Sequence, residues 1–399
     1  MQKLQPADIG ELKEVLAHCN AARKSIEIGG HFTKRWMGGS VQPADMVVST
    51  ARLNHVIDYE PRDLTISVEA GVGFRNLQEL LRENNEMLPL DPPLAEQSTV
   101  GGVVAASCSG PRRRLYGSAR DMVIGMTFVT VEGRPVRSGG MVVKNVAGLD
   151  MAKLMIGSFG TLAAIASVNF KVFPRPPKEK TFVLAFQSLE RALQARDAVL
   201  RSALQPSVID LANPALCRRL GLKLGQGFWL LVEAGGIDAV LGRYERELKA
   251  LARQLETAEF VSLEADEAES LWRSVRDFPA LPPLNGSSET GPRETGAVVR
   301  ISTPLARLDQ AFAAAGDWPA LARAGTGVTY VRCEESPAEL TGRARAAGLY
   351  AVIESCSTGD KDNLELWADP GPELDLMSRI KNNLDPQSIL NHGRLYNRL

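Results

Sequence analysis

The stretch EIGGHFTKRWMGG, residues 27–39, brings glycines together with side chains that could hold an anion. Gly29 and Gly30 can adopt backbone angles that other residues avoid, so successive N–H groups of this turn could point at one anionic ligand. Thr33 and Lys34 would add a hydroxyl and a positive charge. The spacing does not match the nucleoside triphosphate loop G-x-x-x-x-G-K-[ST]. Taken alone, the stretch would also suit an ordinary glycine turn.

A second zone, STVGGVVAASCSGPRRRLYGSARD at residues 98–121, crowds small residues into a short stretch. A flat ligand and its phosphates could lie against such bare backbone. Residues 112–114 are three consecutive arginines, which suit either a solvated basic turn or a contact with a phosphate or a partner. Arg120 and Asp121 would form no more than a surface pair.

A third zone, residues 143–174, carries Lys144, Asn145, Gly148 and Asp150 in an otherwise apolar run. If Asn145 and Asp150 are buried, they require hydrogen-bond partners. For each residue alone, a role in capping or stabilising a turn is a sufficient explanation.

The elements that would position these zones can be read from hydrophobic periodicity and capping signals. Asp8 precedes an apolar helical face and Glu11 follows at capping-box spacing, so we expect a helix over 8–24. The glycine turn then leaves a short strand. Further expected elements are strands over 45–50 and 64–71, a helix over 74–84, and a hairpin over 122–140 that turns at 132–134.

The segment FPRPPKEK, residues 173–180, is the clearest domain boundary because it combines three prolines with a charge run. Beyond it, strands and helices alternate, which predicts an antiparallel sheet with helices on one side. Residues 279–296 are expected to form a mobile loop. The expected strands cover 181–186, 228–236, 297–302, 327–333, 351–356 and 364–369, and the expected helices cover 188–203 and 237–256.

Composition narrows the possible functions. The chain has 399 residues, 44% of them hydrophobic, and a net charge of −1, which disfavours binding to nucleic acid or to an anionic membrane. Its five cysteines lie far apart without a C-x-x-C pair, so they are expected to be reduced thiols and not ligands of a metal or an iron–sulfur cluster. We found no signal peptide at the start and no run of about 18 apolar residues, so the sequence predicts a cytoplasmic protein.

The order of the three zones resembles the flavin-binding domain of the vanillyl-alcohol oxidase and p-cresol methylhydroxylase (PCMH-type) superfamily. Within that superfamily, the chain is most similar to the FAD-binding E subunits of bacterial glycolate oxidase complexes. The resemblance covers residues 1–176, and the tail LDPQSILNHGRLY, 384–396, is similar to the family's closing segment. His392 stands where that segment usually has proline, which leaves the contact of the tail with the flavin ring open.

The resemblance implies an α+β fold. A two-lobed PCMH-type FAD-binding domain would span 1–176, and a smaller α+β cap domain with an antiparallel sheet would span 177–399, with 384–396 returning to the flavin domain. It also implies FAD contacts, mostly from the main chain. The residues implied are Gly29, Gly30, His31, Phe32, Thr33, Lys34, Thr99, Val100, Gly101, Gly102, Ser107, Gly110, Tyr116, Gly117, Gly157, Gly160, Thr161 and Ile165.

His31 bears on how the FAD is held. In some relatives, a histidine after a Gly-Gly pair in this loop is bonded covalently to the flavin 8α carbon. The glycolate oxidase subunits do not generally use such a bond, so the resemblance favours non-covalent FAD, with His31 near the dimethylbenzene edge of the flavin. Asp121 matches a turn acid with a structural role.

The catalytic residues are not identified by the sequence. Related 2-hydroxy acid dehydrogenases, and the larger D subunit of the same complex, carry a His-x-His-Gly-Asp-Gly-type motif that residues 177–399 lack. A base would have to be a lone residue such as Tyr330, Glu354 or His392. An arginine for a substrate carboxylate could be Arg300 or Arg332.

Three functions remain open. The first is an FAD subunit of a complex that oxidises glycolate to glyoxylate and passes electrons through flavin to an iron–sulfur subunit, beside a larger FAD-binding catalytic subunit. Such a protein would reach the inner membrane only through its partners. The second is a self-sufficient FAD oxidase or dehydrogenase of another 2-hydroxy acid or an alditol. The third is a non-catalytic assembly subunit that retains the flavin fold.

Overall fold

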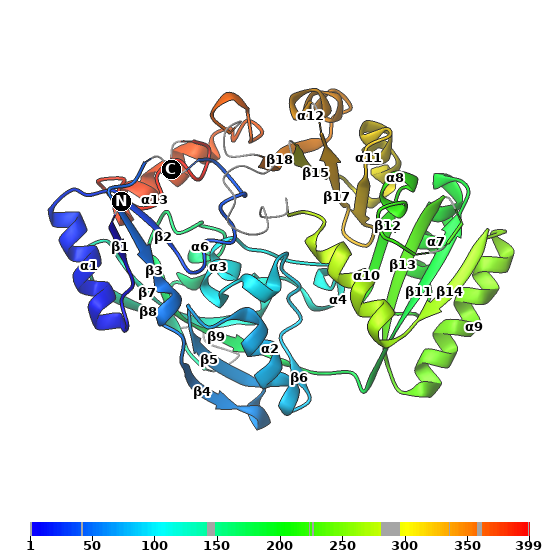
Figure 1. Ribbon diagram of the computed structural model, residues 1–399, viewed down its shortest axis with the longest axis horizontal. Helices are drawn as coiled ribbons and strands as arrows, with labels where there is room; N and C mark the ends of the chain where they lie inside the picture. Colours follow the sequence, from blue (N-terminus) through cyan, green and yellow to red (C-terminus); the bar gives the residue numbers. More distant parts are fainter. Residues whose placement is uncertain are drawn as a thin grey trace. The chain divides into compact units, whose positions relative to one another are not determined.

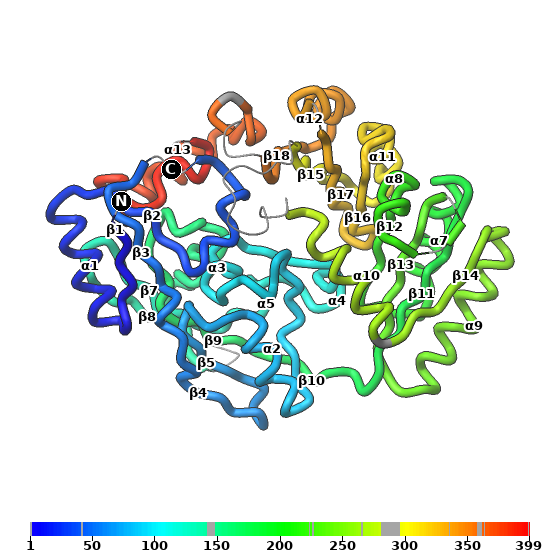
Figure 2. The backbone as a smooth tube through the Cα atoms, viewed as in Figure 1, coloured from blue at the N-terminus to red at the C-terminus, as the bar shows by residue number. Residues whose placement is uncertain are grey.

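The chain divides into two compact units. Unit 1 comprises Met1–Ser109, Gly117–Arg175 and Asp369–Leu399, and unit 2 comprises Gly110–Tyr116 and Pro176–Ala368. The division expected from the sequence neither separated 110–116 nor placed 369–383 in the first unit. The computed structural model (Figures 1 and 2) describes residues 2–40, 43–141, 148–222, 224–225, 227–280, 296–334, 336–356, 361–397 and 399.

The first lobe of unit 1 is a parallel three-stranded sheet packed against helix α1. The expected helix is confirmed: α1 spans Ile9–Ala21, and the Asp8 carboxylate accepts a hydrogen bond of 2.9 Å from the Glu11 N–H. Its buried face, which includes Leu12 and Leu16, packs against the sheet. The strand order is β1 (Gln2–Leu4), β3 (Met46–Ser49) and β2 (Ile26–Gly29).

The second lobe is an antiparallel five-stranded sheet. The hairpin expected over 122–140 is confirmed, with Gly133 at φ +76° in its turn. The strand order is β4 (Val56–Glu60), β5 (Thr65–Glu69), β9 (Ala164–Lys171), β7 (Val123–Val129) and β8 (Pro135–Gly139), and a separate pair joins β6 (Glu86–Met87) to β10 (Phe173–Pro174). The other elements are η1 (Thr50–Arg52), η2 (Pro61–Asp63), α2 (Phe74–Glu83), η3 (Ala95–Gln97), α3 (Val100–Ala105), α5 (Ala119–Met122) and α6 (Ala152–Met155).

Asp121 has the structural role that the sequence predicted. Its carboxylate accepts hydrogen bonds from the Ser118 N–H and hydroxyl at 2.8 and 2.9 Å, which forms the capping box of α5. These bonds hold the pKa of Asp121 below its usual value. Arg120 does not pair with Asp121 and instead donates a hydrogen bond of 3.0 Å to the Lys153 carbonyl.

The C-terminal segment completes the first lobe. Helix α13 (Glu373–Leu384) precedes a tail that runs beside β2, where Ile26 and the tail exchange main-chain hydrogen bonds of 2.7 and 2.9 Å. Figure 2 shows this red segment next to the dark blue strand. The buried Lys381 ammonium donates to Asp385 at 2.6 Å and to the Thr161 carbonyl at 2.7 Å. The last residues are therefore built into the fold of unit 1.

Unit 2 is an antiparallel eight-stranded sheet with helices on both faces. Helices α7 (Leu189–Arg201), α9 (Asp238–Gln254), α11 (Leu308–Ala315) and α12 (Pro337–Ala346) cover one face, and the first two lie where the sequence predicted helices. The expectation of helices on one side only is wrong, because α8 (Pro214–Cys217) and α10 (Ala265–Asp277) cover the other face. The reason is that alternate residues of a strand such as β11 are apolar on both faces: Phe182 and Leu184 point one way, Val183 and Ala185 the other. Both faces therefore require cover.

The strands and helices of unit 2 have the following order and bounds. The strand order is β14 (Glu259–Leu263), β11 (Lys178–Phe186), β13 (Phe228–Gly236), β12 (Val208–Ala212), β16 (Ala320–Arg323), β17 (Val328–Cys333), β15 (Ala297–Ser302) and β18 (Tyr350–Cys356). The helices are α4 (Arg113–Tyr116), α7 (Leu189–Arg201), α8 (Pro214–Cys217), α9 (Asp238–Gln254), α10 (Ala265–Asp277), η4 (Leu305–Arg307), α11 (Leu308–Ala315), α12 (Pro337–Ala346) and η5 (Lys361–Asn363).

Two expectations for this half of the chain differ from the structure or fall outside it. The strand expected over 364–369 is wrong, because this stretch has no strand assignment. Its main chain accepts single hydrogen bonds, from the Ile353 N–H at Leu366 and from the Arg345 guanidinium at Trp367. Of the loop expected over 279–296, residues 281–295 lie outside the described residues.

The arginine run of the second zone explains why residues 110–116 belong to unit 2. Arg112 donates to Glu233 at 3.0 Å and to Glu179 at 2.7 Å. Glu233 is buried and also accepts a hydrogen bond of 2.8 Å from the Ser207 hydroxyl. Arg112 is therefore not part of a solvated turn, and a contact with a phosphate or a partner would have to compete with these two ion pairs. Arg113 is exposed.

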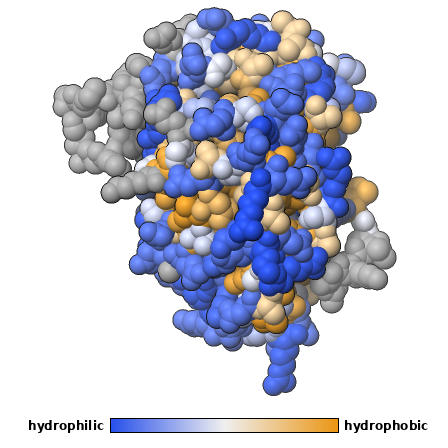
Figure 3. Space-filling model, turned by 90° about the vertical axis from the view of Figure 1, so that its right-hand side faces the viewer, coloured by the Kyte–Doolittle hydropathy of each residue, from blue (hydrophilic) through white to orange (hydrophobic). Residues whose placement is uncertain are grey.

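Among the described residues, no helix combines the length and apolar character needed to cross a bilayer. Figure 3 shows one face, on which hydrophobic residues gather near the middle within a largely hydrophilic surround. Exposed large hydrophobic residues of unit 2 include Ile237, Val240 and Tyr350.

Candidate cofactor site

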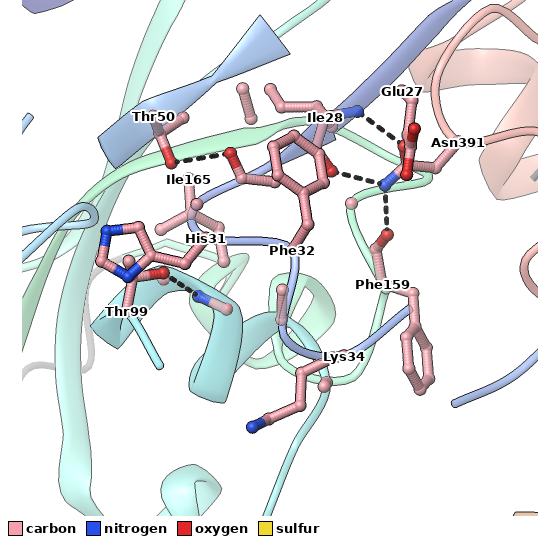
Figure 4. Close-up of a pocket in the computed structure, with 18 of the residues that line it drawn as sticks. Glu27, Ile28, His31, Phe32, Lys34, Thr50, Thr99, Phe159, Ile165 and Asn391 are labelled. Carbon is pink, nitrogen blue, oxygen red and sulfur yellow. Dashed lines mark hydrogen bonds between the residues drawn. The ribbon is translucent and has the colours of Figure 1, made fainter. Parts of the chain in front are cut away.

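A pocket in unit 1 collects most of the first zone and parts of the other two (Figure 4). Its walls are the end of β2 with the loop that follows, the start of α3, the turn before β9, and the C-terminal tail. The cavity has a volume of about 90 Å³. Its lining residues are Glu27, Ile28, Gly29, Gly30, His31, Phe32, Thr33, Lys34, Arg35, Thr50, Thr99, Gly101, Gly102, Ala105, Ala106, Phe159, Gly160, Ala163, Ala164, Ile165, Asn391 and Arg394.

Two glycines of the wall are required by close approach. A Cβ on Gly30 would overlap the Thr99 side chain. Gly160 lies at φ +71°, and a Cβ there would come within 2.8 Å of the Asn391 side-chain nitrogen. These two glycines are therefore required by the packing of the pocket wall itself, and the close approach of a ligand stays a prediction.

Hydroxyl groups next to β2 orient the main chain of the glycine turn. The Ser49 hydroxyl donates to the Gly30 carbonyl at 2.9 Å, and the Thr50 hydroxyl donates to the Gly29 carbonyl at 3.4 Å. Thr99 caps α3 by accepting a hydrogen bond of 3.3 Å from the Gly102 N–H. These bonds set the direction of the peptide groups that face the cavity.

Asn391 ties three walls of the pocket together. Its carbonyl oxygen accepts from the Ile28 N–H at 2.7 Å, and its amide nitrogen donates to the carbonyls of Ile28 and Phe159 at 3.0 and 2.7 Å. The residue lies at φ +41°, a region that asparagine tolerates better than most residues. Sequence reasoning missed Asn391, although its place in the family-like tail was the available signal.

Lys34 supports the pocket from behind. Its ammonium donates to the Pro93 carbonyl at 2.6 Å and to the Ser98 hydroxyl at 2.7 Å, and the residue is buried. Figure 4 shows its side chain running away from Phe32 and Asn391. Lys34 thus joins the glycine loop to the segment before α3.

His31 has a defined ring orientation. Its Nδ1 lies 2.9 Å from the Gln97 carbonyl oxygen. Because a carbonyl can only accept, we assign the hydrogen to Nδ1, which leaves Nε2 without one in the neutral ring. Nothing in this arrangement tests whether His31 bonds to a flavin.

Phe32 and Arg35 form the outer edge of the loop. Phe32 lies in the left-handed region at φ +58°, which is uncommon for a bulky residue. The Arg35 guanidinium lies 4.5 Å from the centre of its ring and is paired with Glu27 through two hydrogen bonds of 2.6 and 2.7 Å. A strained backbone at a pocket wall is typical of a binding site.

Arg394 is the buried cation of the tail. Its guanidinium donates to the carbonyls of Lys34 and Arg35 at 2.8 and 3.2 Å and lies 5.3 Å from the centre of the Phe159 ring. Burial lowers the pKa of the Arg394 guanidinium to about 10. Sequence reasoning also missed this residue.

Not every residue expected to bind FAD lines this pocket. Eleven expected residues do: Gly29, Gly30, His31, Phe32, Thr33, Lys34, Thr99, Gly101, Gly102, Gly160 and Ile165. Seven others do not: Val100, Ser107, Gly110, Tyr116, Gly117, Gly157 and Thr161. Gly110 and Tyr116 belong to unit 2, and the Thr161 hydroxyl is turned to the Ser158 carbonyl. The FAD contacts of all eighteen stay predictions.

The residues considered for substrate chemistry lie outside the pocket. Arg300 donates to Glu354 at 2.9 Å, and Tyr330 is its direct partner on the neighbouring strand. Arg332 donates to the Ala280 carbonyl at 2.7 Å. In the tail, the His392 Nδ1 is buried without a hydrogen-bond partner among the described residues. Among all the residues that the structure describes, there is also no group of acidic, His or Cys side chains suited to a metal ion.

Comparison with known proteins agrees with this architecture. Residues 2–139 match the model of the FAD binding domain, and residues 175–317 match that of the C-terminal domain of FAD linked oxidases. Glycolate oxidase subunit GlcE of Escherichia coli (strain K12) is 30% identical, over 93% of this chain and 92% of that protein. Glycolate oxidase subunit GlcD of Bacillus subtilis (strain 168) is 26% identical, over 98% and 88%.

More distant proteins share the fold. The mitochondrial D-lactate dehydrogenase [cytochrome] of Arabidopsis thaliana is 26% identical, over 98% of this chain and 72% of that protein. The solved structure of p-cresol methylhydroxylase superposes with a TM-score of 0.70 at 17% identity, over 99% of this chain and 88% of that one. The 4-ethylphenol oxidase of Gulosibacter chungangensis gives 0.72 at 15%, over 99% and 89%.

The pocket suits the cofactor that these matches imply. Its glycine-rich loop leaves main chain at the cavity, and its wall carries a buried cation, Arg394, two features that suit an anionic dinucleotide. The chain belongs to the FAD-linked oxidases, a family of flavin-dependent oxidoreductases with the PCMH-type FAD-binding fold.

Proposed function

We propose that this chain is the FAD-binding subunit of a complex that oxidises glycolate to glyoxylate. The observation that carries the proposal is the 30% identity to glycolate oxidase subunit GlcE, which extends over nearly the full length of both chains. At 93% of this chain, the likeness is not confined to the cofactor domain.

In this reaction, the main task of the chain is to hold FAD. Oxidation of the alcohol carbon of glycolate removes two electrons and two protons, and bound FAD supplies the two-electron acceptor. The protein must hold the cofactor in one orientation. The Gly30 cradle and the Lys34 bridge to Ser98 would provide the holding, and Asn391 would lock the cradle to the tail.

We propose two partners for this subunit: a larger FAD-binding catalytic subunit and an iron–sulfur subunit that receives the electrons. Two similar proteins are themselves named as subunits, GlcE and GlcD. The five cysteines of this chain are buried, form no disulfide and are spread along the sequence from Cys19 to Cys356, which suits an iron–sulfur electron acceptor in another chain. Attachment to the inner membrane would then occur through the partners.

A second candidate is a self-sufficient dehydrogenase of another 2-hydroxy acid or an alditol. It is favoured by the likeness to D-lactate dehydrogenase over 98% of this chain. In this reading, Arg300 would hold the substrate carboxylate and Glu354 or Tyr330 would take the proton. The Arg300 guanidinium already donates to Glu354, so a substrate would have to share or displace that bond.

The first experiment is an absorption spectrum of the chain expressed alone, followed by acid precipitation. We expect flavin absorption bands at about 370 and 450 nm, with the yellow colour released into the supernatant. Colour in the pellet would indicate a covalent bond, with His31 as the candidate. Absence of flavin after reconstitution with excess FAD would contradict the cofactor role and favour an assembly subunit without chemistry of its own.

Glycolate-dependent reduction of a dye then separates the remaining readings. We expect activity when the chain is co-expressed with the two partner subunits and little activity when it is alone. Turnover of glycolate, D-lactate or an alditol by the isolated chain would favour the self-sufficient enzyme. A complex that is fully active with a variant of this chain unable to bind FAD would favour the assembly subunit.

A further inference from the structure

The charged residues of the pocket wall carry a net positive charge. They are Lys34, Arg35 and Arg394 against one carboxylate, Glu27. Lys34 reaches away to Pro93 and Ser98, and Arg35 is paired with Glu27. Arg394 differs from Arg35 in being buried, and from Lys34 in that its hydrogen bonds go to main-chain carbonyls of the glycine loop itself.

Two other buried cations of the chain have a carboxylate partner. Lys381 is 2% exposed and donates to the buried Asp385 at 2.6 Å. Arg323 is 6% exposed and pairs with the buried Asp210. For Arg394, also 6% exposed, the described residues offer no carboxylate within ion-pair distance; the charge of Glu27 acts on it from further away, and Glu27 is already paired with Arg35. A buried charge without a counter-ion is costly, so its retention at a pocket wall points to a charge that arrives with the ligand.

We propose that Arg394 is the residue that binds the diphosphate of FAD and offsets its charge. The inference rests on FAD as the cofactor and does not depend on which substrate is oxidised. Among the residues expected from the sequence, Lys34 was the cation for this role. In the structure, the Lys34 ammonium instead donates to Pro93 and Ser98 of the wall. Arg394, which comes 360 residues after Lys34 in the chain, lines the cavity.

The chemistry of a guanidinium suits this task. Arginine has five N–H donors in a planar fork that matches phosphate oxygens, and the two carbonyls bonded to Arg394 use only part of that capacity. Those carbonyls belong to Lys34 and Arg35, just after the Gly29–Gly30 turn whose N–H groups are expected to face the same anion. Arg394 is thus attached to the loop that would carry the diphosphate.

The test compares FAD affinity across salt concentrations for the wild-type chain, Arg394→Gln and Arg394→Lys. Each protein is stripped of flavin, and FAD binding is followed by flavin fluorescence from low to high NaCl. We expect Arg394→Gln to weaken binding by about tenfold to a hundredfold at low salt. Its dissociation constant should depend less on salt than that of the wild type, because one ionic contact is lost. Arg394→Lys should bind with intermediate affinity and the wild-type salt dependence.

Arg113→Gln is the matched control, since it removes the same charge from an exposed residue outside the pocket. It should bind FAD as the wild type does. Arg394→Gln with FAD affinity within threefold of the wild type would overturn the proposal. So would weaker binding with an unchanged salt dependence, which would mark Arg394 as a purely structural residue.

A folding failure does not remove the test. If apo Arg394→Gln shows no cooperative melting, Arg394→Lys decides. Retained FAD binding with the wild-type salt dependence supports the proposal, and binding that is lost or independent of salt overturns it. Failure of the wild-type chain to bind FAD would contradict the proposed function as well, whereas failure of glycolate oxidation alone would leave this inference intact.

Discussion

A buried arginine has a carboxylate partner in unit 2 and main-chain carbonyl partners in unit 1. In unit 2, Arg323 and Asp210 are both buried and paired with each other, so the charge is neutralised inside the sheet. In unit 1, Arg394 is equally buried but bonds only to carbonyls at the wall of a pocket. The difference separates a charge that serves the fold from one that serves a ligand, and burial alone does not reveal it.

The comparison applies to the pocket and not to all of unit 1. The tail behind the pocket holds the closed pair of Lys381 and Asp385, which resembles the arrangement in unit 2. Buried ion pairs therefore hold segments of chain together in both units. At the cavity wall, Arg394 instead donates to main-chain carbonyls.

Removal of Asp210 should have the largest effect on stability. Asp210→Ala would leave the buried Arg323 guanidinium without its carboxylate, which typically costs about 3–5 kcal/mol of unfolding free energy. Urea unfolding of unit 2, followed by tryptophan fluorescence, measures the change. Asp238→Ala is the control, because its pair with Lys178 is 78% exposed on the Asp side and should contribute little. Equal effects of the two substitutions would break the comparison.

Removal of Arg112 should have the next largest effect. Arg112→Ala deprives the buried Glu233 of its cation and detaches residues 110–116 from β13, at a cost of about 1.5–3 kcal/mol. The exposed neighbour provides the control, since Arg113→Ala should change the unfolding free energy by about 0.5 kcal/mol or less. A phosphate-binding role for Arg112 would instead appear as weaker FAD binding at unchanged stability.

The cradle itself is tested by Gly160→Ala. Its φ of +71° should cost an alanine about 1–2 kcal/mol, and the new Cβ would also meet the Asn391 amide. Gly221→Ala is matched, because Gly221 has φ +74° and open space around it. The Gly160 variant should therefore be the less stable of the two in thermal melting, and it should also bind FAD more weakly. Indistinguishable melting would mean that the Asn391 contact adds nothing.

The smallest effect is expected at Glu86, a buried carboxylate of unit 1 that accepts a hydrogen bond of 2.9 Å from Tyr59. Burial raises the pKa of Glu86 above its usual value. The folded state therefore favours the protonated acid, so its contribution is fully present below the unfolded pKa and is lost as pH rises through the folded pKa. Glu86→Gln, which stays neutral, should match the wild type in acid and be more stable at pH 7. A stability difference that does not change with pH would refute this assignment.

Local signals in the sequence predicted much of the fold. Asp8 and Glu11 marked the start of α1, and Gly133 marked the β7–β8 turn, because caps and turns depend on neighbours a few residues away. The glycines at 29, 30 and 160 likewise indicated the cradle. The strand expected over 364–369 failed because alternation alone does not supply a partner strand, and α10 escaped notice because it covers a second sheet face.

The candidate site was only half visible from the sequence. Its loop and the start of α3 were found, together with the resemblance that pointed to FAD. The partners of Arg112 lie 67 and 121 residues away, so nothing in the run of three arginines distinguishes it from its neighbours. The same limit hid Asn391 and Arg394, which meet the first zone only in the folded chain.

By itself, the sequence determined the class of protein, the glycine loop and the absence of a metal-binding motif, since these depend on residue type and short spacing. Tertiary structure alone decided which charges are neutralised and which remain available. The Lys34 ammonium donates to the Pro93 carbonyl in the wall, whereas Arg394, near the other end of the chain, donates to the Lys34 carbonyl beside the cavity. The reason is physical: the cost of a buried charge depends on what lies within a few ångströms, and only the fold sets those distances.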